Sequence, residues 1–298
     1  MKKVRVAPKG DLIFNVGAEC QLHQFLTEKF AGKSRSALKS LLAHRRVSVN
    51  GSVTTAYDYA LRVGDKVAIN RGRAAAELHH PMLRIVFEDQ HIIVVDKRNG
   101  LLSMGTDKQR DKTAYSILSH HVKLEDPANR IFIVHRLDRE TSGLMIFAKS
   151  EEVKHRLQAD WHRIVIDRKY IAVADGVMPA EEGVIDAPLA ENRNRKMFVS
   201  RTPDEDNAVD AVTHYRVLRS RGGRSLVELS LETGRKNQIR AHLEHVGCPV
   251  AGDKKYSSRS TDAGRVCLHA YKLALYHPIT GEELFFSTSI PKLFDNLI

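Results

Sequence analysis

Residues 135–143 gather side chains of the kinds that take part in catalysis. They read HRLDRETSG and lie between two apolar runs, residues 131–134 and 144–148, whose length and composition are typical of buried strands. Asp138 stands between two arginines, and because nearby positive charge favours the ionised form of a carboxyl, we expect it to be charged. A charged carboxylate on a loop held by two buried strands is suited to act as a nucleophile or a base. The alternative is a solvated turn, in which Asp and Thr side chains bond to the backbone.

Two further segments carry polar side chains suited to a site. Residues 231–243 read LETGRKNQIRAHL, and we predict a helix over residues 238–245. Arg240 lies in its first turn, where positive charge opposes the helix dipole and a nearby anion would be stabilising. The alternative is an arginine-rich helix start on the surface. Tyr170 lies in residues 168–175, RKYIAVAD, which the pattern predicts to be a strand. Taken alone, a tyrosine in a strand is most often a core or edge residue.

These three segments resemble one family of RNA-modifying enzymes. HRLDRETSG resembles the HRLDxxTSG signature of the RluA-type pseudouridine synthases, which isomerise uridine in RNA. Residues 231–243 resemble the family's TGRxHQIRxHL motif, except that Asn237 stands where histidine is usual, and residues 168–175 are similar to its K-x-Y-x-A strand. Smaller matches follow in the expected order, and we interpret them as structural: residues 249–253 with Tyr256, residues 268–270 and residues 277–282.

The resemblance implies a role for each matched polar residue. Asp138 is implied to be the catalytic carboxylate and Arg240 the cation that pairs with it. Tyr170 is implied to be the active-site tyrosine, whose ring stacks on the base or whose hydroxyl assists proton removal from C5. Arg136 is implied to fill the space that a flipped base vacates, and Arg235 to bind RNA.

The first quarter of the chain carries most of the excess positive charge. The formal net charge is +11, and residues 1–80 alone have an excess of eight positive charges, which points to a polyanionic partner. Two predicted helices, residues 21–30 and 35–44, and a hairpin turn at Asn50-Gly51 resemble the S4 RNA-binding module. The resemblance implies that a basic helix edge contacts RNA backbone through Arg35, Lys39, Arg45 and Arg46. The alternatives are helices that only solvate their Lys and Arg, and a generic solubilising surface.

Composition limits the class of protein. Hydrophobic residues make up 42% and charged residues 28% of the 298 residues, which is ordinary for a soluble globular protein large enough for two domains. No apolar run approaches the length of a membrane span, and the N-terminus lacks the apolar stretch of a signal peptide. The three cysteines are widely spaced, which indicates reduced thiols in a cytoplasmic protein. Metal-ligand spacing, a P-loop and a dinucleotide fingerprint are absent, so we expect neither metal nor cofactor.

We predict an α+β fold with a mainly antiparallel sheet, because hairpin-linked strands outnumber helices. A pseudouridine synthase catalytic domain at residues 76–298 is expected to follow a small S4-like RNA-binding domain at residues 1–75. The implied function is isomerisation of specific uridines in structured RNA by a monomer, with ribosomal RNA as the expected partner and tRNA as the alternative. A non-catalytic RNA-binding or ribosome-assembly factor with the same fold stays open. A hydrolase that uses His and Asp is disfavoured, because no Ser or Cys nucleophile motif accompanies them.

Overall fold

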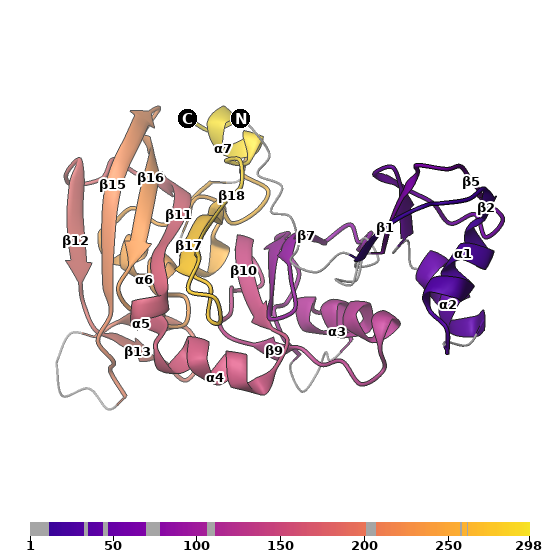
Figure 1. Cartoon of the computed structure of the whole chain (residues 1–298). Coiled ribbons are helices and arrows are strands. Elements are labelled where there is room, and N and C mark those ends of the chain that lie inside the picture. The colour runs from indigo at the N-terminus through magenta and orange to yellow at the C-terminus, as the bar shows by residue number, and fades with distance from the viewer. Residues whose placement is uncertain are drawn as a thin grey trace. The chain divides into compact units, whose positions relative to one another are not determined.

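The computed structural model describes residues 12–32, 35–43, 47–69, 78–105, 111–200, 207–256, 258–260 and 262–298. The chain divides into two compact units (Figure 1), namely Met1–Leu78 with Leu124–Pro127, and His79–Lys123 with Ala128–Ile298. Within the described residues, no helix is both long enough and apolar enough to cross a membrane.

The N-terminal unit packs two helices on a small antiparallel sheet. Its described elements are α1 (Leu22–Lys29), α2 (Arg35–Ala43), a sheet in the order β1 (Leu12–Asn15), β6 (Lys66–Ile69), β3 (Val47–Val49), β4 (Ser52–Val53), and the pair β2 (Cys20–Gln21) and β5 (Ala60–Leu61). Asn50 and Gly51 join β3 to β4 with φ angles of 50° and 81°, as an Asn-Gly hairpin turn requires. Leu22 and Leu26 of α1 meet Val47 and Val67 of the sheet in one core.

The second unit is built around one sheet, in which the described residues form ten strands. The strands run β12 (Glu182–Asp186), β15 (Val212–Arg221), β16 (Arg224–Leu231), β11 (Val165–Asp175), β17 (Leu268–Tyr276), β10 (Ser142–Ala148), β8 (Ile92–Lys97) and β7 (Leu83–Glu88), with β18 (Glu283–Ser287) beside β17 and β9 (Phe132–Ile133) beside β10. A separate hairpin pairs β13 (Leu189–Glu191) with β14 (Met197–Val199). All pairings in the large sheet are antiparallel except that of β10 with β17. The predicted α+β fold with a mainly antiparallel sheet is confirmed.

Short helices pack against this sheet. They are α3 (Ala114–Glu125), α4 (Glu151–Ala159), α5 (Trp161–Ile164), α6 (Gln238–His245), the 3₁₀ turn η1 (Lys254–Tyr256) and α7 (Lys292–Asn296). Helix α4 begins after Ser150, whose side-chain oxygen accepts a hydrogen bond from the backbone N–H of Val153. Val153 and Leu157 of α4 share a core with Leu144 and Ile146 of β10. Figure 1 shows α4 and α5 one after the other along the lower edge of the sheet.

The parallel pairing of β10 with β17 is a narrow seam in the sheet. It consists of Ser142 opposite His269 and Gly143 opposite Ala270. Gly143 has a φ of 115°, and a Cβ atom added to it would lie 2.1 Å from the Ala270 carbonyl oxygen. Only glycine fits here, because other residues would meet both the steric clash and the unfavourable backbone angle. The glycine that ends the HRLDRETSG signature is therefore a packing residue.

The two apolar runs that flank the signature form unequal strands. The second run gives β10, which begins at Ser142, inside the signature, and whose seven residues are all buried. The first run gives only β9, whose two residues are half-buried. Strand β9 pairs with the last two residues of β10 alone, so its other edge has no strand neighbour among the described residues. The predicted strand at residues 131–134 is therefore confined to two half-buried residues, although Ile131 and Val134 on either side of it are buried.

Candidate active site

The backbone of the loop that carries Asp138 is hydrogen-bonded to a buried lysine, Lys97, the last residue of β8. The Lys97 side chain has no exposed surface, and its Nζ donates to the backbone carbonyls of Thr141, Leu101 and Asp138 at 2.6, 2.8 and 3.2 Å. Burial lowers the pKa of Lys97 to about 7, against the attraction of the Asp138 charge. Sequence reasoning assigned no role to this lysine, because a lysine is rarely buried.

The side-chain amide of Asn237 lies against the Asp138 carboxylate. Asn237 precedes α6, is 8% exposed and has a φ of 52°. With the amide nitrogen facing Asp138, it donates to Oδ2 at 2.7 Å and to Oδ1 at 3.0 Å, and the amide oxygen accepts from the Tyr256 hydroxyl at 3.2 Å. The opposite orientation would set the amide oxygen against two carboxylate oxygens, which repel it. Asn237 therefore donates to Asp138.

Arg240 is held mainly by a second carboxylate, Asp253. Its Nε and Nη2 donate to the two Asp253 oxygens at 2.5 and 2.8 Å, and both side chains are buried. The guanidinium also lies over the Tyr256 ring, with Cζ 5.0 Å from the centroid. Its remaining nitrogen, Nη1, lies 3.6 Å from Asp138 Oδ2 and 3.5 Å from Glu140 Oε2. The sequence had placed Asp253 in a structural turn, and the structure makes it the partner that fixes Arg240.

Burial dominates the protonation equilibrium of Asp138. The loss of water contact raises the pKa of this carboxyl, although the charges of Arg240 and Arg136 act to lower it. The charge of Arg136 therefore acts on Asp138 in the expected direction, but burial outweighs it, and the net shift of the pKa is upward. Arg136 and Arg139 are exposed, so solvent screens their charges. The charge that acts most strongly on Asp138 comes from Arg240, far away in the sequence.

Tyr170 of β11 is buried at a small pocket, and the charge of Asp138 acts on its phenol. It is 6% exposed, and its pocket is lined by His135, Leu144, Arg168, Ala270, Lys272 and Leu273. Burial raises the pKa of the Tyr170 phenol, and the negative charge of Asp138 raises it further. Tyr170 is therefore a neutral phenol at physiological pH. His135 is also neutral, because burial lowers its pKa to about 3 while its Nε2 accepts the Ile146 N–H at 3.1 Å.

The residues expected to bind RNA lie on the surface where they are described. Arg136 is exposed in the Asp138 loop, and Arg235 is exposed before α6, with its Nε bonded to the Asp210 carbonyl at 3.0 Å. In the N-terminal unit, Arg35 and Lys39 are exposed on α2, and the Lys39 ammonium lies 5.3 Å from the centroid of the Tyr57 ring. The other two predicted RNA-binding residues, Arg45 and Arg46, fall outside the described residues.

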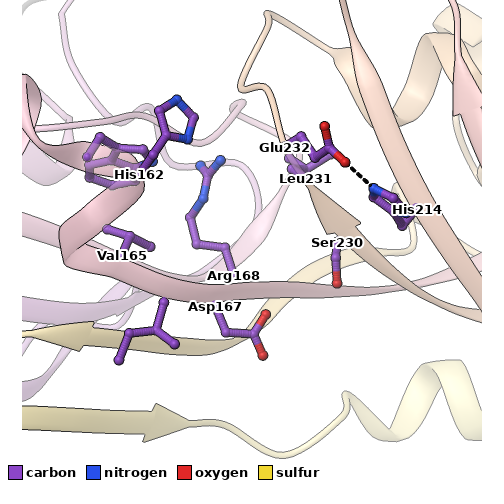
Figure 2. Close-up of a pocket in the computed structure, with 10 residues that line it drawn as sticks. His162, Val165, Asp167, Arg168, His214, Ser230, Leu231 and Glu232 are labelled. Atoms are coloured by element: carbon purple, nitrogen blue, oxygen red, sulfur yellow. Dashed lines mark hydrogen bonds and ion pairs between the residues drawn. The ribbon is translucent and has the colours of Figure 1, made fainter.

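A surface cavity of about 160 Å³ opens beside Arg168, which also lines the Tyr170 pocket (Figure 2). Its wall includes Trp161, His162, Asp167, His214 and Glu232. The Arg168 guanidinium points into this cavity and stacks on Trp161, with Cζ 5.2 Å from the ring centroid. Among the described residues, it makes no hydrogen bond or ion pair. Because its N–H donors are unused, the cavity can accept an anionic group next to Tyr170.

Two buried histidines of the second unit, His242 and His269, are engaged in hydrogen bonds. His242 bonds to Thr213 Oγ1 and to the Ala187 carbonyl, each at 2.9 Å, and His269 bonds to Ser142 Oγ and Thr288 Oγ1 at 2.7 and 2.8 Å. The described part of the chain contains no group of three or more His, Cys, Asp or Glu side chains that could hold a metal ion.

Comparison with known proteins identifies the family. Residues 91–245 match the model of the RNA pseudouridylate synthases, and residues 21–67 match the S4 domain. The chain is 35% identical to the ribosomal large subunit pseudouridine synthase D of Escherichia coli K12, over 93% of this chain and 89% of that protein. It is 34% identical to an uncharacterised RNA pseudouridine synthase, YlyB, of Bacillus subtilis, over 93% of both chains. A solved human structure, RNA pseudouridylate synthase domain containing 4, is 30% identical and superposes with a TM-score of 0.58 over 71% of this chain and 90% of that one.

The family matches cover the S4 segment and the part of the second unit that holds Asp138 in its loop, Tyr170 in β11 and Arg240 in α6. The chain belongs to the RNA pseudouridylate synthases, a family of isomerases, and it carries an S4 RNA-binding domain in its N-terminal unit.

Proposed function

We propose that this protein converts uridine to pseudouridine in ribosomal RNA and that Asp138 is essential to the reaction. The observation that carries the proposal is the setting of Asp138. This carboxylate lies in the family's signature loop, on a backbone fixed by Lys97, and it faces Asn237, Arg240 and Tyr170. A reactive group held by buried partners needs little reorganisation when a substrate arrives.

The reaction rearranges the nucleoside without adding or removing atoms. The bond between C1′ and N1 breaks, the uracil turns, and a bond forms between C1′ and C5, while C5 gives up a proton and N1 gains one. Asp138, in its ionised form, acts on the nucleoside during cleavage of the glycosidic bond. The neutral phenol of Tyr170 contributes its ring as a stacking surface and its hydroxyl as a relay for the C5 proton.

Access to Asp138 requires the uridine to leave its helical stack, because a carboxylate in the protein cannot reach the sugar or ring inside a duplex. Unstacking costs a few kcal/mol, less in a loop than in a helix. Arg136, exposed in the same loop as Asp138, is placed to fill the vacated space. Arg168 in the neighbouring cavity has unused donors for a phosphate next to the flipped nucleotide.

Ribosomal RNA is the proposed substrate because a relative at 35% identity over 93% of this chain is named as a large-subunit enzyme. The S4 domain fits a structured RNA, and its exposed Arg35 and Lys39 would contact phosphates without reading sequence.

The test is to map pseudouridines in a strain that lacks the gene. Carbodiimide-adduct primer extension across ribosomal RNA and tRNA is compared for the deletion strain, the strain complemented with the wild-type gene, and the strain complemented with Asp138→Asn. We expect defined ribosomal sites to be lost on deletion, restored by wild type and not restored by Asp138→Asn. Loss of sites only in tRNA would overturn the ribosomal assignment. An unchanged map would favour a non-catalytic RNA-binding factor, and restoration by Asp138→Asn would refute the role of Asp138.

A further inference from the structure

Asn237 lies closer to the reactive carboxylate than Arg240 does, although it departs from the family's usual histidine. We infer that Asn237 is a positioning residue, whose amide group donates to both oxygens of Asp138 and holds that carboxylate ionised and aimed at the substrate. The inference rests on the proposed role of Asp138. Its contacts are 2.7 and 3.0 Å, whereas the Arg240 contact with Asp138 is 3.6 Å.

The orientation of the amide follows from its neighbours. The Tyr256 hydroxyl, 3.2 Å away, can donate or accept and so tolerates either orientation. Arg240 Nη1 lies 3.4 Å from the amide atom that faces Asp138 and would favour an oxygen there. The two carboxylate oxygens are closer and carry the negative charge, so they select the nitrogen.

The backbone holds this amide rigidly. Asn237 has a φ of 52°, in the left-handed region that Asn, Asp, His and Gly tolerate best, and it directly precedes α6. The residue is 8% exposed, so its side chain has little room to turn away. Arg240 follows one helical turn later and is fixed by Asp253. The start of α6 therefore presents two donors to Asp138, one neutral and one charged.

A neutral donor gives the site a hydrogen bond that does not titrate. An imidazole at this position would gain or lose a proton near pH 6.5, whereas an amide donates at every pH that the fold survives. The titratable and charged groups coupled to Asp138 are Arg136 and Glu140 of its own loop and, from other elements, Lys97 of β8, Tyr170 of β11, Arg240 of α6 and Lys255 of η1. Asn237 contributes no charge to this set, so its removal changes hydrogen bonding alone.

The test uses Asn237→Gly, because glycine keeps the left-handed backbone and deletes the amide. A lost hydrogen bond to a charged group costs about one unit in the pKa of its acceptor. We expect the acidic limb of the pH–rate profile to move up by about one pH unit, and kcat at neutral pH to fall about tenfold, with RNA affinity within twofold of wild type. Asn207→Gly is the matched control, since Asn207 is exposed with a φ of 76°.

Two substitutions that suit the same backbone sharpen the test. Asn237→Asp sets a second carboxylate against Asp138, so the pair shares one proton; we expect activity only at acidic pH and at least a tenfold loss at pH 7. Asn237→His should restore most of the rate that Asn237→Gly loses and add a titration near pH 6.5. A role limited to folding would lower thermal stability without moving these profiles.

A measurement on the free protein separates this inference from the function on which it rests. Carbon-13 NMR of the Asp138 carboxyl gives its pKa without RNA, and Asn237→Gly must raise that pKa. If the wild-type protein modifies no RNA but the pKa rises, the proposed function fails and the hydrogen bond stands. If the wild type is active and Asn237→Gly keeps the wild-type pH profile and carboxyl pKa, the inference is overturned.

Discussion

The N-terminal unit and the catalytic unit handle positive charge in opposite ways. On α2, Arg35 and Lys39 stand exposed to solvent. At the active site, Arg240 is 4% exposed and meets the carboxylates of Asp253, Glu140 and Asp138. Solvent screens exposed charges, which attract a phosphate backbone whatever its sequence. Buried charges keep their full strength but need partners, since an unpaired ion inside a protein is very costly.

This difference predicts that substitutions of buried charges have larger effects than substitutions of exposed ones. A surface cation can be removed at the cost of its own contact with RNA. A buried charge is tied to its neighbours, so its removal alters protonation, geometry and stability together.

The largest effect is expected for Asp138→Asn, which keeps the shape of the side chain and removes the reactive oxygen. Turnover of a uridine-containing RNA should fall by about 10⁴-fold or more, as for loss of a nucleophile in other enzymes. RNA affinity should stay within a few-fold of wild type. Asp186→Asn, an exposed carboxylate on β12, is the control and should keep wild-type turnover. Substantial turnover by Asp138→Asn would remove Asp138 from the reaction.

Arg240→Met should combine a kinetic defect with a loss of stability. We expect turnover to fall about a hundredfold, because Asp138 loses a cationic neighbour. Unfolding in urea should show a loss of about 3–5 kcal/mol, because Asp253 is left buried without its bidentate partner.

A double variant separates these two effects. Adding Asp253→Asn to Arg240→Met removes the uncompensated charge and should restore part of the stability but none of the turnover. If the double variant recovered activity, Arg240 would serve only the fold.

Lys97→Met should destabilise the protein by about 2–4 kcal/mol, because the backbone carbonyls of Leu101, Asp138 and Thr141 lose their donor. The pKa of Lys97 is about 7 in the folded protein and about 10.4 in an unfolded chain, so between these values the unfolded state binds more protons. The contribution of Lys97 to the free energy of unfolding therefore increases as pH rises from about 7 to about 10. The wild-type slope of unfolding free energy against pH in this window should exceed that of Lys97→Met; equal slopes would contradict the lowered pKa.

The smallest effect is expected on the N-terminal unit. The double variant Arg35→Ala with Lys39→Ala should weaken RNA binding several-fold and reduce the slope of log affinity against log salt by about 1.5. At saturating RNA, kcat should stay at the wild-type value. Lys29→Ala is the control, because Lys29 lies 3.6 Å from Glu28 and its charge is already partly neutralised. An unchanged salt slope in the double variant would show that α2 does not contact RNA.

The sequence was sufficient to predict the features that short contiguous motifs specify, such as single helices and hairpins. It predicted α6 with the bounds that the structure has, residues 238–245, and the structure brings Asp138, Tyr170 and Arg240 into one site. Hairpin signals and alternating apolar runs were enough for the antiparallel pairs of consecutive strands, namely β7–β8, β9–β10, β15–β16 and β17–β18. The pairings that join these pairs into one sheet connect strands that are not consecutive in the chain. The roles of these residues in the reaction remain proposals.

What escaped prediction depends on contacts between distant parts of the chain. Asp253 and Lys97 became part of the site only when the fold buried them beside Arg240 and the catalytic loop. The upward shift of the Asp138 pKa could not be predicted from the sequence, because it comes from burial, and the strongest charge that acts on Asp138 belongs to Arg240, far away in the chain. Arg136 and Arg139 turn to solvent, while burial and Arg240 set the balance.

The seam at Gly143 has a consequence for how the enzyme can be silenced. Two residue pairs join β10, which follows the Asp138 loop, to β17. Strand β17 in turn pairs with β11, which carries Tyr170. An added methyl group at Gly143 would act as a wedge, because it would collide with the Ala270 carbonyl. Such a protein would keep the side chains of Asp138 and Tyr170 but change the distance between them. Activity would therefore depend on the spacing of β10 and β17 as well as on the residues themselves.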